Sequence, residues 1–307
     1  MKILVTGGAG FIGSHLVEEL LLNKNEILIF DNLLTGKKEN LDISGNFKFI
    51  NDDFGSESSL EEIKKFNPEI CFHLAAQSSV VVSVENPALD FEHNILQPIK
   101  LIQILLKSNC KKLVFTSSGG TIFGEPTVIP TAEGDYADEP ESPYGVAKKR
   151  LNELIKIMTK NSNLKYSILN LSNVYGPRQD PHGEAGVISI FAKKYLKHEE
   201  PVIYGDGEQT RDYIFVKDVV KALVKSSKID QNLFLNIGTG VETSVNNLAN
   251  SMKLQFNSEI NPTYKPAREG ELNRSVLNNE KAKHELDWEP EYSLDEGMKA
   301  VFNWLET

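Results

Sequence analysis

The sequence is short of cysteine and has no long apolar run. Two cysteines, Cys71 and Cys110, among 307 residues are too few for a disulfide framework or a thiolate metal site, so we expect neither. Both lie beside apolar segments, which predicts buried thiols in a reducing compartment, the cytoplasm. No apolar stretch approaches about 18 residues, so no membrane-spanning segment is expected. No secretory leader is expected either, because residues 1–6 already have the pattern of a strand.

Basic residues are fewer than acidic residues. The chain has 33 Lys and Arg against 43 Asp and Glu, for a formal net charge of -10. Binding to nucleic acid or to an acidic membrane surface requires clustered cations, and the basic runs here are as short as Lys148-Lys149-Arg150. Both kinds of partner are therefore excluded. Hydrophobic residues make up 40% of the chain, which is typical of a globular protein with a sizeable core.

Short aliphatic segments alternate with helical patterns over the first half of the chain. The segments typical of buried parallel strands are residues 3–5, 26–30, 47–50, 70–74, 112–116 and 166–171. Helical patterns cover residues 11–23, 87–108 and 143–161. This alternation predicts an α/β fold with a Rossmann-type, doubly wound parallel sheet.

The pattern changes after about residue 173. Loops rich in Gly, Pro and Asp separate helical patterns at residues 187–196, 216–226 and 293–305. We interpret residues 1–173 as one domain and residues 174–307 as mainly a smaller lobe that closes over the carboxyl edge of the sheet. A strand pattern at residues 233–237 is expected to return to the main sheet.

A glycine-rich turn follows the first predicted strand, and it reads Thr6-Gly7-Gly8-Ala9-Gly10-Phe11-Ile12-Gly13. Gly7 permits the tight turn, Gly10 lets the backbone approach a pyrophosphate, and Gly13 allows close helix–strand packing. The unpaired N–H groups of the helix that starts at Phe11 and Ile12 then face the phosphates. Such a turn alone is also compatible with an ordinary loop, but the strand–turn–helix context favours a dinucleotide site.

The second strand ends at Asp31-Asn32, and Asp31 lies eighteen residues beyond Gly13. The spacing expected for a ribose-binding carboxylate is about 20 residues. A carboxylate here accepts hydrogen bonds from both adenosine ribose hydroxyls and repels the extra phosphate of NADP. The expected cofactor is therefore NAD, and residues 1–173 are interpreted as the NAD-binding domain.

Two further segments end at the same edge of the sheet. Asp53-Phe54 supplies a carboxylate and an apolar wall for the adenine, or else belongs to a helix N-cap region with Ser56 and Ser58. His73-Leu74-Ala75-Ala76 ends the fourth strand, and its small residues let the backbone approach the cofactor. We interpret His73 itself as a packed, hydrogen-bonded strand residue.

Tyr144 and Lys148 lie four residues apart in a helical pattern that begins after Ser142-Pro143. Positions i and i+4 share one helix face, so a tyrosine hydroxyl and a lysine ammonium point into one cleft. The ammonium and an oxidised nicotinamide both favour the phenolate and lower the tyrosine pKa, which makes Tyr144 a candidate base near neutral pH. A Tyr-x-x-x-Lys pair is common on helices, but this one follows the fifth strand of a predicted NAD-binding sheet.

Taken together, these motifs resemble the extended short-chain dehydrogenase/reductase family, and within it the nucleotide-sugar epimerases of the UDP-glucose 4-epimerase type. The resemblance runs essentially from end to end. Its anchors are residues 6–13, Asp31-Asn32, residues 73–76, Tyr144 to Lys148, Asn173-Val-Tyr-Gly-Pro177, Tyr204-Gly-Asp-Gly207 with Arg211-Asp212, and Arg268-Glu-Gly-Glu271.

The resemblance implies an NAD-dependent 4-epimerase of a UDP-sugar. Tyr144 would take a proton from a sugar hydroxyl while hydride moves to NAD, and Lys148 would hold the nicotinamide ribose. The transient 4-keto sugar turns within the site, and hydride returns to its other face. The implied substrates are UDP-glucose or UDP-galactose, a UDP-N-acetylhexosamine or a UDP-uronic acid.

The resemblance also assigns residues to the two ligands. Cofactor positions, besides those above, are Leu74, Ala75, Ala76 and Ser117. Substrate positions are Gln77, Asn173, Val187, Tyr204, Arg211, Arg268 and Glu271. Asn173, Arg211 and Arg268 match positions that grip the nucleotide diphosphate, which agrees with the bidentate pairing of guanidinium and phosphate.

The sequence departs from the family at the end of the fifth strand. The usual catalytic Ser or Thr falls on Gly119, which has no hydroxyl. Either Ser118 or Thr121 supplies the missing hydrogen bond, and the flanking glycines make the necessary backbone distortion cheap. Sugar 4,6-dehydratases of the family carry an Asp-Glu pair where this chain has Gly120 and Thr121, so epimerisation is favoured over elimination of water.

The sequence also suggests what determines the sugar specificity and how subunits assemble. Seven residues after Arg268, where relatives can carry a bulky side chain, Ser275 leaves room for an N-acetyl group or a carboxylate, unless a neighbouring loop fills the space. The helices near residues 87–108 and 143–161 have wide apolar stripes. In the family that the chain resembles, the equivalent helices pair across a twofold axis, so the resemblance implies a homodimer, although core packing alone explains much of that pattern. The alternatives to an epimerase are a nucleotide-sugar reductase or dehydrogenase that releases NADH, and a catalytically silent NAD-binding protein.

Overall fold

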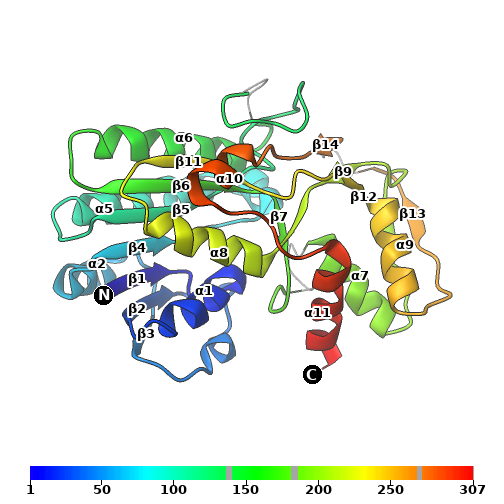
Figure 1. The fold of residues 1–307 in the computed structure, drawn as a ribbon, viewed down its shortest axis with the longest axis horizontal. Coiled ribbons are helices and arrows are strands. Elements are labelled where there is room, and N and C mark those ends of the chain that lie inside the picture. Colours follow the sequence, from blue (N-terminus) through cyan, green and yellow to red (C-terminus); the bar gives the residue numbers. More distant parts are fainter. Residues whose placement is uncertain (136–139, 181–185, 268–271, 307) are drawn as a thin grey trace. The chain divides into compact units, whose positions relative to one another are not determined.

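The computed structural model describes residues 1–135, 140–180, 186–267 and 272–306. Its central sheet has seven strands in the order β11-β6-β5-β4-β1-β2-β3 (Figure 1). In chain order these strands are β1 (Lys2–Thr6), β2 (Glu26–Asp31), β3 (Phe47–Asn51), β4 (Ile70–His73), β5 (Lys112–Ser118), β6 (Lys165–Leu171) and β11 (Leu233–Ile237). The pairs β1–β2, β1–β4, β2–β3 and β4–β5 are parallel. The predicted Rossmann-type α/β fold is confirmed, and β11 lies at the edge of the sheet beside β6.

The strands are apolar on both faces because helices cover both faces of the sheet. Consecutive residues Ile3, Leu4 and Val5 of β1 are all buried, which is the pattern of a strand enclosed between two helical layers. On one face, Leu4 and Phe115 belong to a core cluster with apolar residues of α2 (Glu57–Phe66), α5 (Gln97–Leu105) and α6 (Pro143–Thr159). Helices α1 (Phe11–Leu21) and α8 (Val216–Ser227) lie on the opposite face, which is turned toward the viewer in Figure 1.

The helix predicted over residues 87–108 is confirmed over residues 87–105, but it is not α-helical throughout. It consists of α4 (Pro87–Phe91), the π-helical segment η2 (Glu92–Leu96) and α5, with the short helix α3 (Val80–Glu85) in front of it. Pro98 has no N–H to donate to the carbonyl four residues earlier. The preceding turn is wider, and the N–H of Gln97 bonds to the oxygen of Glu92, five residues back.

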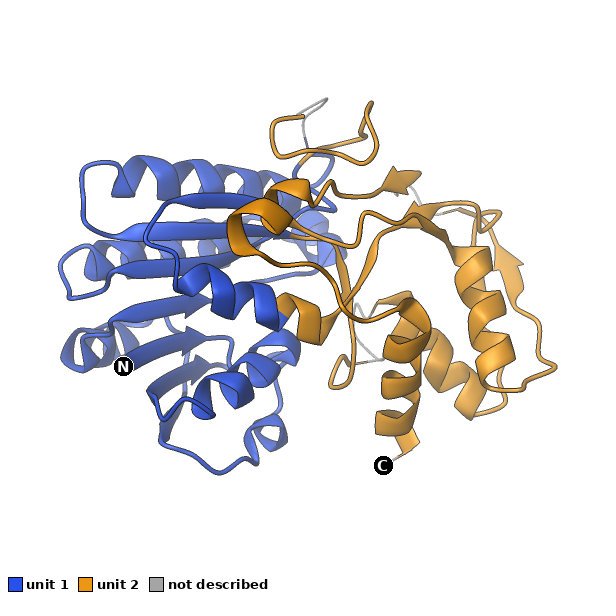
Figure 2. Ribbon diagram, in the orientation of Figure 1, with its two compact units in different colours: residues 1–122, 140–170, 220–235 blue, residues 123–139, 171–219, 236–307 orange. Residues whose placement is uncertain are grey.

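The chain forms two compact units, which are coloured separately in Figure 2. Unit 1 consists of residues 1–122, 140–170 and 220–235, and unit 2 of residues 123–139, 171–219 and 236–307. Unit 1 holds the sheet with its helices and a 3-10 turn, η1 (Lys38–Leu41), whereas β6, α8 and β11 each have residues in both units.

Unit 2 consists of short strands and helices. The strands are β7 (Asn173–Tyr175), β8 (Val202–Tyr204), β9 (Thr210–Arg211), β10 (Tyr213–Phe215), β12 (Thr243–Ser244), β13 (Thr263–Lys265) and β14 (Arg274–Ser275). They pair as β10–β7, β12–β9–β14 and β13–β8. The helices are α7 (Val187–Leu196), α9 (Val245–Gln255), α10 (Glu280–Leu286) and α11 (Leu294–Glu306).

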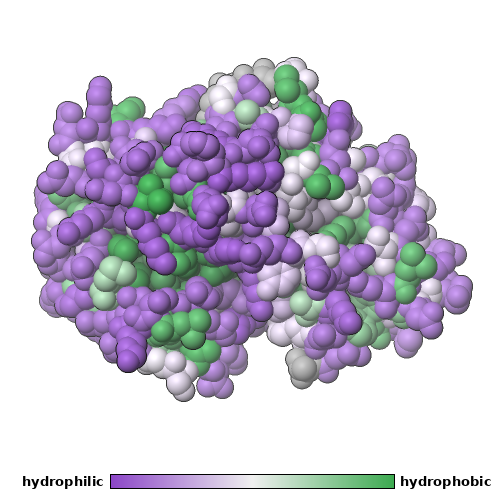
Figure 3. Space-filling view, in the orientation of Figure 1, coloured by the Kyte–Doolittle hydropathy of each residue, from purple (hydrophilic) through white to green (hydrophobic). Residues whose placement is uncertain are grey.

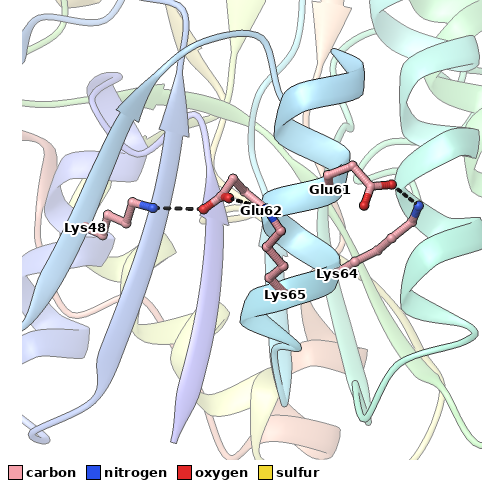
Figure 4. A network of polar contacts seen from close by, with 5 residues as sticks. All are labelled: Lys48, Glu61, Glu62, Lys64 and Lys65. Atoms are coloured by element: carbon pink, nitrogen blue, oxygen red, sulfur yellow. Dashed lines mark hydrogen bonds and ion pairs between the residues drawn. The ribbon is translucent and has the colours of Figure 1, made fainter.

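Charged residues dominate the surface of unit 1 around α2. Figure 4 shows Lys48 of β3 reaching Glu62 of α2 at 2.9 Å, while Glu62 also pairs with Lys65 and Glu61 with Lys64. These pairs are exposed to solvent, which screens their attraction, so they contribute little to stability. Figure 3 shows that hydrophilic residues cover most of the face in view. Within the described ranges, no helix is long and apolar enough to cross a membrane.

Candidate active site

The glycine-rich turn joins β1 to α1 and leaves little space for side chains. Gly7 has a left-handed φ of 76°, and a Cβ there would lie 2.7 Å from the backbone nitrogen of Ala75. A Cβ on Gly13 would lie 2.0 Å from the carbonyl oxygen of Gly7. At Gly10, by contrast, the one atom near an added Cβ would be the same oxygen, at 3.2 Å. Gly7 and Gly13 are therefore required by the packing of the turn, whereas Gly10 leaves open space on its Cβ side.

Helix α1 begins at this open side of the turn. Its N-cap residue, Gly10, has an extended backbone and no side chain to bond the first-turn amides. The first of these amides belong to Phe11, Ile12 and Gly13. A helix N-terminus without a side-chain cap presents N–H groups and the positive end of the helix dipole to an anion.

Asp31 stands at the carboxyl end of β2 with 8% of its surface exposed. Its two carboxylate oxygens accept hydrogen bonds of 2.9 Å from the backbone N–H groups of Ala9 and Leu33. Burial raises the pKa of this carboxyl, whereas the bonds from Leu33, Ala9 and Gly10 act to lower it. Asp31 therefore also ties the glycine turn to the loop after β2, a structural role that sequence reasoning missed. The neighbouring Asn32 caps that loop by accepting a bond from Leu34 N–H.

The residues after β3 and β4 are mostly engaged with the protein itself. Asp53 accepts a bond from the N–H of Gly55, and its carboxylate lies 3.6 Å from the ring of His93. Phe54 packs edge-on against His73 in the core. Helix α2 does begin nearby with a serine N-cap, Ser56, as the alternative interpretation of this segment expects.

His73 is a packed strand residue, as predicted. Its Nδ1 lies 2.7 Å from the hydroxyl of Thr6, and its ring stacks on Phe115. Burial, with a contribution from Lys148, lowers the pKa of His73 to about 3, so the ring is neutral at physiological pH. Behind it, the N–H groups of Leu74 and Ala75 bond to the Thr6 carbonyl and hold residues 74–76 beside the glycine turn.

Tyr144 and Lys148 lie together on α6. Ser142 caps this helix by accepting a bond from the N–H of Gly145. Lys148 is only 3% exposed; its Nζ donates to the carbonyl of Thr116 at 3.1 Å and lies 5.9 Å from the Tyr144 ring centroid. Burial lowers the pKa of Lys148 to about 8, and the charge of Asp90 acts to raise it.

The end of β5 and the turn after it carry the candidate hydroxyls. Ser117 Oγ and Thr121 Oγ1 are buried and have no hydrogen-bond partner among the described residues. The carbonyl of Ser118, whose side chain is half-buried, accepts bonds from the N–H groups of Thr121 and Ile122. A Cβ on Gly145 would lie 2.8 Å from the carbonyl oxygen of Thr121. The turn therefore packs against the first turn of α6, which carries Tyr144.

The predicted substrate residues are divided between the units. In unit 1, both amide hydrogens of Gln77 are used, toward Ser79 O and Asp90 Oδ1. In unit 2, Asn173 is exposed in β7, Val187 starts α7 and Tyr204 ends β8. Arg211 of β9 is the register partner of Ser275 of β14, which is 7% exposed. Arg268 and Glu271 lie outside the described residues.

Sequence reasoning missed a buried polar cluster next to α6. Asp90 and Asn94 are buried and bond to each other and to Gln77. Their signal in the sequence is a pair of polar residues at i and i+4, which share one helix face. Within the described residues, no group of three or more His, Cys, Asp or Glu side chains could hold a metal ion.

Comparisons with known proteins agree with this geometry over the whole chain. A UDP-glucose 4-epimerase of Mycolicibacterium smegmatis is 40% identical over 302 residues, which cover 97% of this chain and 96% of the relative. The crystal structure of a UDP-glucose 4-epimerase from Thermotoga maritima with UDP-glucose has a TM-score of 0.96 at 44% identity and covers 100% of this chain and 99% of the other. The UDP-glucose 4-epimerase of Thermus thermophilus, solved in complex with NAD, has a TM-score of 0.92 at 37% identity, with the same coverage.

One protein-family model matches nearly the whole sequence. The family model described as GDP-mannose 4,6 dehydratase matches residues 4–301. This range contains the glycine turn, the carboxyl end of β2 and the Tyr144–Lys148 pair, on which the resemblance to extended short-chain dehydrogenases/reductases was based. The chain belongs to the GDP-mannose 4,6 dehydratase family of extended short-chain dehydrogenases/reductases.

Proposed function

We propose that this protein is an NAD-dependent 4-epimerase that acts on a UDP-sugar. The observation that carries the proposal is the Tyr144–Lys148 pair: both side chains are buried, on one face of α6, directly beside the end of β5. Similar proteins over the full length of the chain are UDP-glucose 4-epimerases. The family model is named for a dehydratase, but Gly120 and Thr121 stand where dehydratases carry Asp and Glu, so this chain has no acid there for the elimination of water.

The residues at the end of β1 and β2 fit the cofactor. The open space at Gly10 and the uncapped start of α1 suit a pyrophosphate, and the Asp31 carboxylate suits the adenosine ribose. The cofactor site would also include Asn32, Asp53, Phe54 and residues 74–76. Ser117 would bond to the cofactor through its buried hydroxyl, which has no hydrogen-bond partner among the described residues. When bound, NAD supplies the acceptor and donor of hydride for the sugar carbon.

The residues of this chain transfer one proton and hold the ligands. Tyr144, as a phenolate, removes the proton of the 4-hydroxyl and later returns it to the 4-keto oxygen of the turned sugar. The Lys148 ammonium stabilises the phenolate, because opposite charges close together favour the ionised form. Ser118 or Thr121 donates a hydrogen bond to the oxygen at C4, in place of the hydroxyl that Gly119 lacks.

Unit 2 would hold the nucleotide sugar. Asn173, Arg211 and Arg268 are assigned to the diphosphate, while Gln77, Val187, Tyr204 and Glu271 complete the proposed substrate set. The Arg211–Ser275 register pair supports this assignment, because it places a small buried side chain next to a proposed phosphate-binding residue. We expect the space at Ser275 to admit an N-acetyl group or a carboxylate on the sugar. In this proposal, residues 1–173 mainly bind NAD, and residues 174–307 mainly bind substrate.

The proposed enzyme is a homodimer in the cytoplasm. Several apolar residues of the α3–η2 region and of α6 are exposed, which a partner subunit would cover; they are Val80, Val81, Val84, Leu89, Phe91, Leu96 and Ile157. Cys71 and Cys110 are buried free thiols, which suits a reducing compartment.

The decisive experiment is incubation of the purified protein with UDP-glucose, UDP-N-acetylglucosamine and UDP-glucuronic acid, followed by separation of the C4 epimers. We expect interconversion of at least one pair without net change in the absorbance of reduced cofactor. Steady accumulation or consumption of NADH would instead indicate a dehydrogenase or reductase. The variant Tyr144→Phe keeps the ring but removes the hydroxyl, and should lower kcat by about 10²–10⁴-fold. Full activity of this variant would refute the assignment.

A further inference from the structure

A buried carboxylate lies beside the helix that carries the proposed catalytic pair. Asp90 of α4 has 0% of its surface exposed. Its Oδ1 accepts hydrogen bonds from Gln77 Nε2 at 2.7 Å and from Asn94 Nδ2 at 2.9 Å. Its Oδ2 is buried and accepts no hydrogen bond within the part of the chain that the structure describes. A buried carboxylate with two neutral donors and one bare oxygen is costly, unless a cation compensates its charge.

Lys148 is a buried cation on the neighbouring helix α6. Helix α4 and segment η2 both pack against α6, and the charges of Asp90 and Lys148 interact. Lys148 is itself buried, and its Nζ bonds to a neutral group, the carbonyl of Thr116. Among the described residues, neither Asp90 nor Lys148 has an oppositely charged group at ion-pair distance. Lys148 Nζ also lies 4.7 Å from the centroid of the Phe115 ring, which is a neutral contact. The attraction between Asp90 and Lys148 therefore acts over a longer range, and low-polarity surroundings strengthen it.

We infer that Asp90 is a positioning residue, whose buried carboxylate is the counter-charge that keeps Lys148 protonated beside Tyr144. The inference rests on the proposed function, since it assigns to Asp90 a role in preparing the base. Burial lowers the pKa of Lys148 to about 8, and the charge of Asp90 already opposes that shift. Without the carboxylate, Lys148 would lose its proton at a lower pH, and Tyr144 would lose the cation that stabilises its phenolate.

The other titratable groups around the pair do not replace Asp90. His73 faces Lys148 from β4 and is neutral, because its pKa lies at about 3. His93 of η2 faces Asp90 and lies 3.6 Å from the carboxylate of Asp53, its ion-pair partner when protonated. Tyr144 faces Lys148 from the same helix. Among these groups, Asp90 is the one carboxylate that acts on Lys148.

The test uses Asp90→Asn, which keeps the shape and one acceptor oxygen but removes the charge. Ionisation of Tyr144 is followed in the full-length protein with NAD by ultraviolet difference titration, with Tyr144→Phe in each background as the blank. We expect the apparent pKa of Tyr144 to rise by about one pH unit, a tenfold loss of phenolate near neutral pH. The acid limb of kcat for UDP-glucose should move by the same amount, with KM changed less than about twofold.

A matched control separates charge from folding. Asp218→Asn also neutralises a buried carboxylate, one that accepts the backbone N–H groups of Glu291 and Tyr292 in unit 2. It should lower the Tm without moving the titration of Tyr144. If Asp90→Asn moves neither the titration nor the acid limb, the inference is overturned, even when turnover falls uniformly at all pH values. If the wild type epimerises no UDP-sugar but the titration still shifts, the proposed function fails and the coupling stands.

A second variant keeps the inference testable if Asp90→Asn folds poorly. Asp90→Asn combined with Lys148→Met removes both buried charges, whereas each single change leaves one charge uncompensated. We expect the double variant to have a higher urea midpoint than either single variant. Additive losses of stability would show that the two groups do not compensate each other and would overturn the inference.

Discussion

Lys148 Nζ donates a hydrogen bond of 3.1 Å to the carbonyl oxygen of Thr116, a residue 32 positions earlier in the chain. The bond ties the middle of α6 to the end of β5, where the candidate hydroxyls of Ser117, Ser118 and Thr121 follow. Because Lys148 is buried, this bond also fixes the direction of its ammonium group. The proposed base and the proposed hydrogen-bond donor thus come from two segments that one polar contact holds together.

Gly10 and Gly13 of the turn should respond differently to alanine. Gly13→Ala would place a methyl 2.0 Å from the Gly7 carbonyl, so we expect a loss of stability of roughly 1–3 kcal/mol or more. Gly10→Ala meets only the same oxygen, at 3.2 Å, and should fold with a Tm near that of the wild type. Its methyl would nevertheless obstruct the pyrophosphate, so NAD should bind at least about tenfold more weakly by calorimetry. Tight NAD binding by Gly10→Ala would contradict the proposed approach of the phosphates.

Ser118→Ala and Thr121→Val should identify the hydroxyl that replaces the one missing at Gly119. Removing a hydrogen bond to the reacting oxygen costs about 10²–10³-fold in kcat. We expect a loss of that order in one variant and near-normal kcat in the other, with KM for the UDP-sugar little changed in both. Thr121 Oγ1 is buried without a partner among the described residues, whereas Ser118 is half-buried. Normal turnover in both variants would exclude both residues from the reaction.

A bulky residue at position 275 should change the sugar specificity. Ser275 is buried beside Arg211, so Ser275→Tyr would place a bulky ring near the proposed phosphate-binding side chain. We expect kcat/KM for UDP-N-acetylglucosamine to fall at least about tenfold, and that for UDP-glucose to change little, because steric exclusion of one extra group is worth about 1–3 kcal/mol. The exposed neighbour provides the control, and Asn273→Tyr should leave both values unchanged. Equal losses for both sugars would refute a role in specificity.

His73 should make the protein less stable as the pH falls. Its pKa is about 3 when folded, below the usual value of 6.5, so the folded state binds fewer protons than the unfolded state between these values. The stability due to neutral His73 is therefore complete above pH 6.5 and is lost progressively down to about pH 3. From pH 7.5 to 5.0, the wild type should lose about 2 kcal/mol more than His73→Asn, measured by urea unfolding. Equal losses in the two proteins would show that His73 is not held neutral.

The exposed apolar residues around η2 should hold two subunits together. Leu96 is 49% exposed, and Leu96→Glu places a charge on that surface. We expect sedimentation to show a dimer for the wild type and a smaller species for Leu96→Glu at micromolar concentration, because an unpaired charge is costly to bury. Leu254→Glu, at an 82% exposed position of α9, serves as the control and should remain dimeric. A monomeric wild type would contradict the proposed assembly.

Local patterns in the sequence were sufficient to predict the main elements of the sheet. The strands from residues 3–5 to 166–171 were each found within one or two residues of their predicted ends. The glycine turn and the Tyr144–Lys148 spacing could also be recognised in the sequence, because each motif consists of only a few consecutive residues. The helix predicted over residues 87–108 was found, but its π-helical segment before Pro98 was not predicted. The sequence also did not predict α2 or the short strands of unit 2, whose pairings join distant segments.

The sequence by itself therefore determined the fold class, the dinucleotide turn and the tyrosine–lysine motif, since strand and helix periods and turn chemistry act over short distances along the chain. Tertiary structure alone decided which groups surround that motif: Asp90 near Lys148, Thr121 against the first turn of α6, and Ser275 beside Arg211. These neighbours come from separate elements and meet only when the elements pack. The charge state of a buried lysine depends on those neighbours and on its burial, and neither can be inferred from the residues adjacent to it in the sequence.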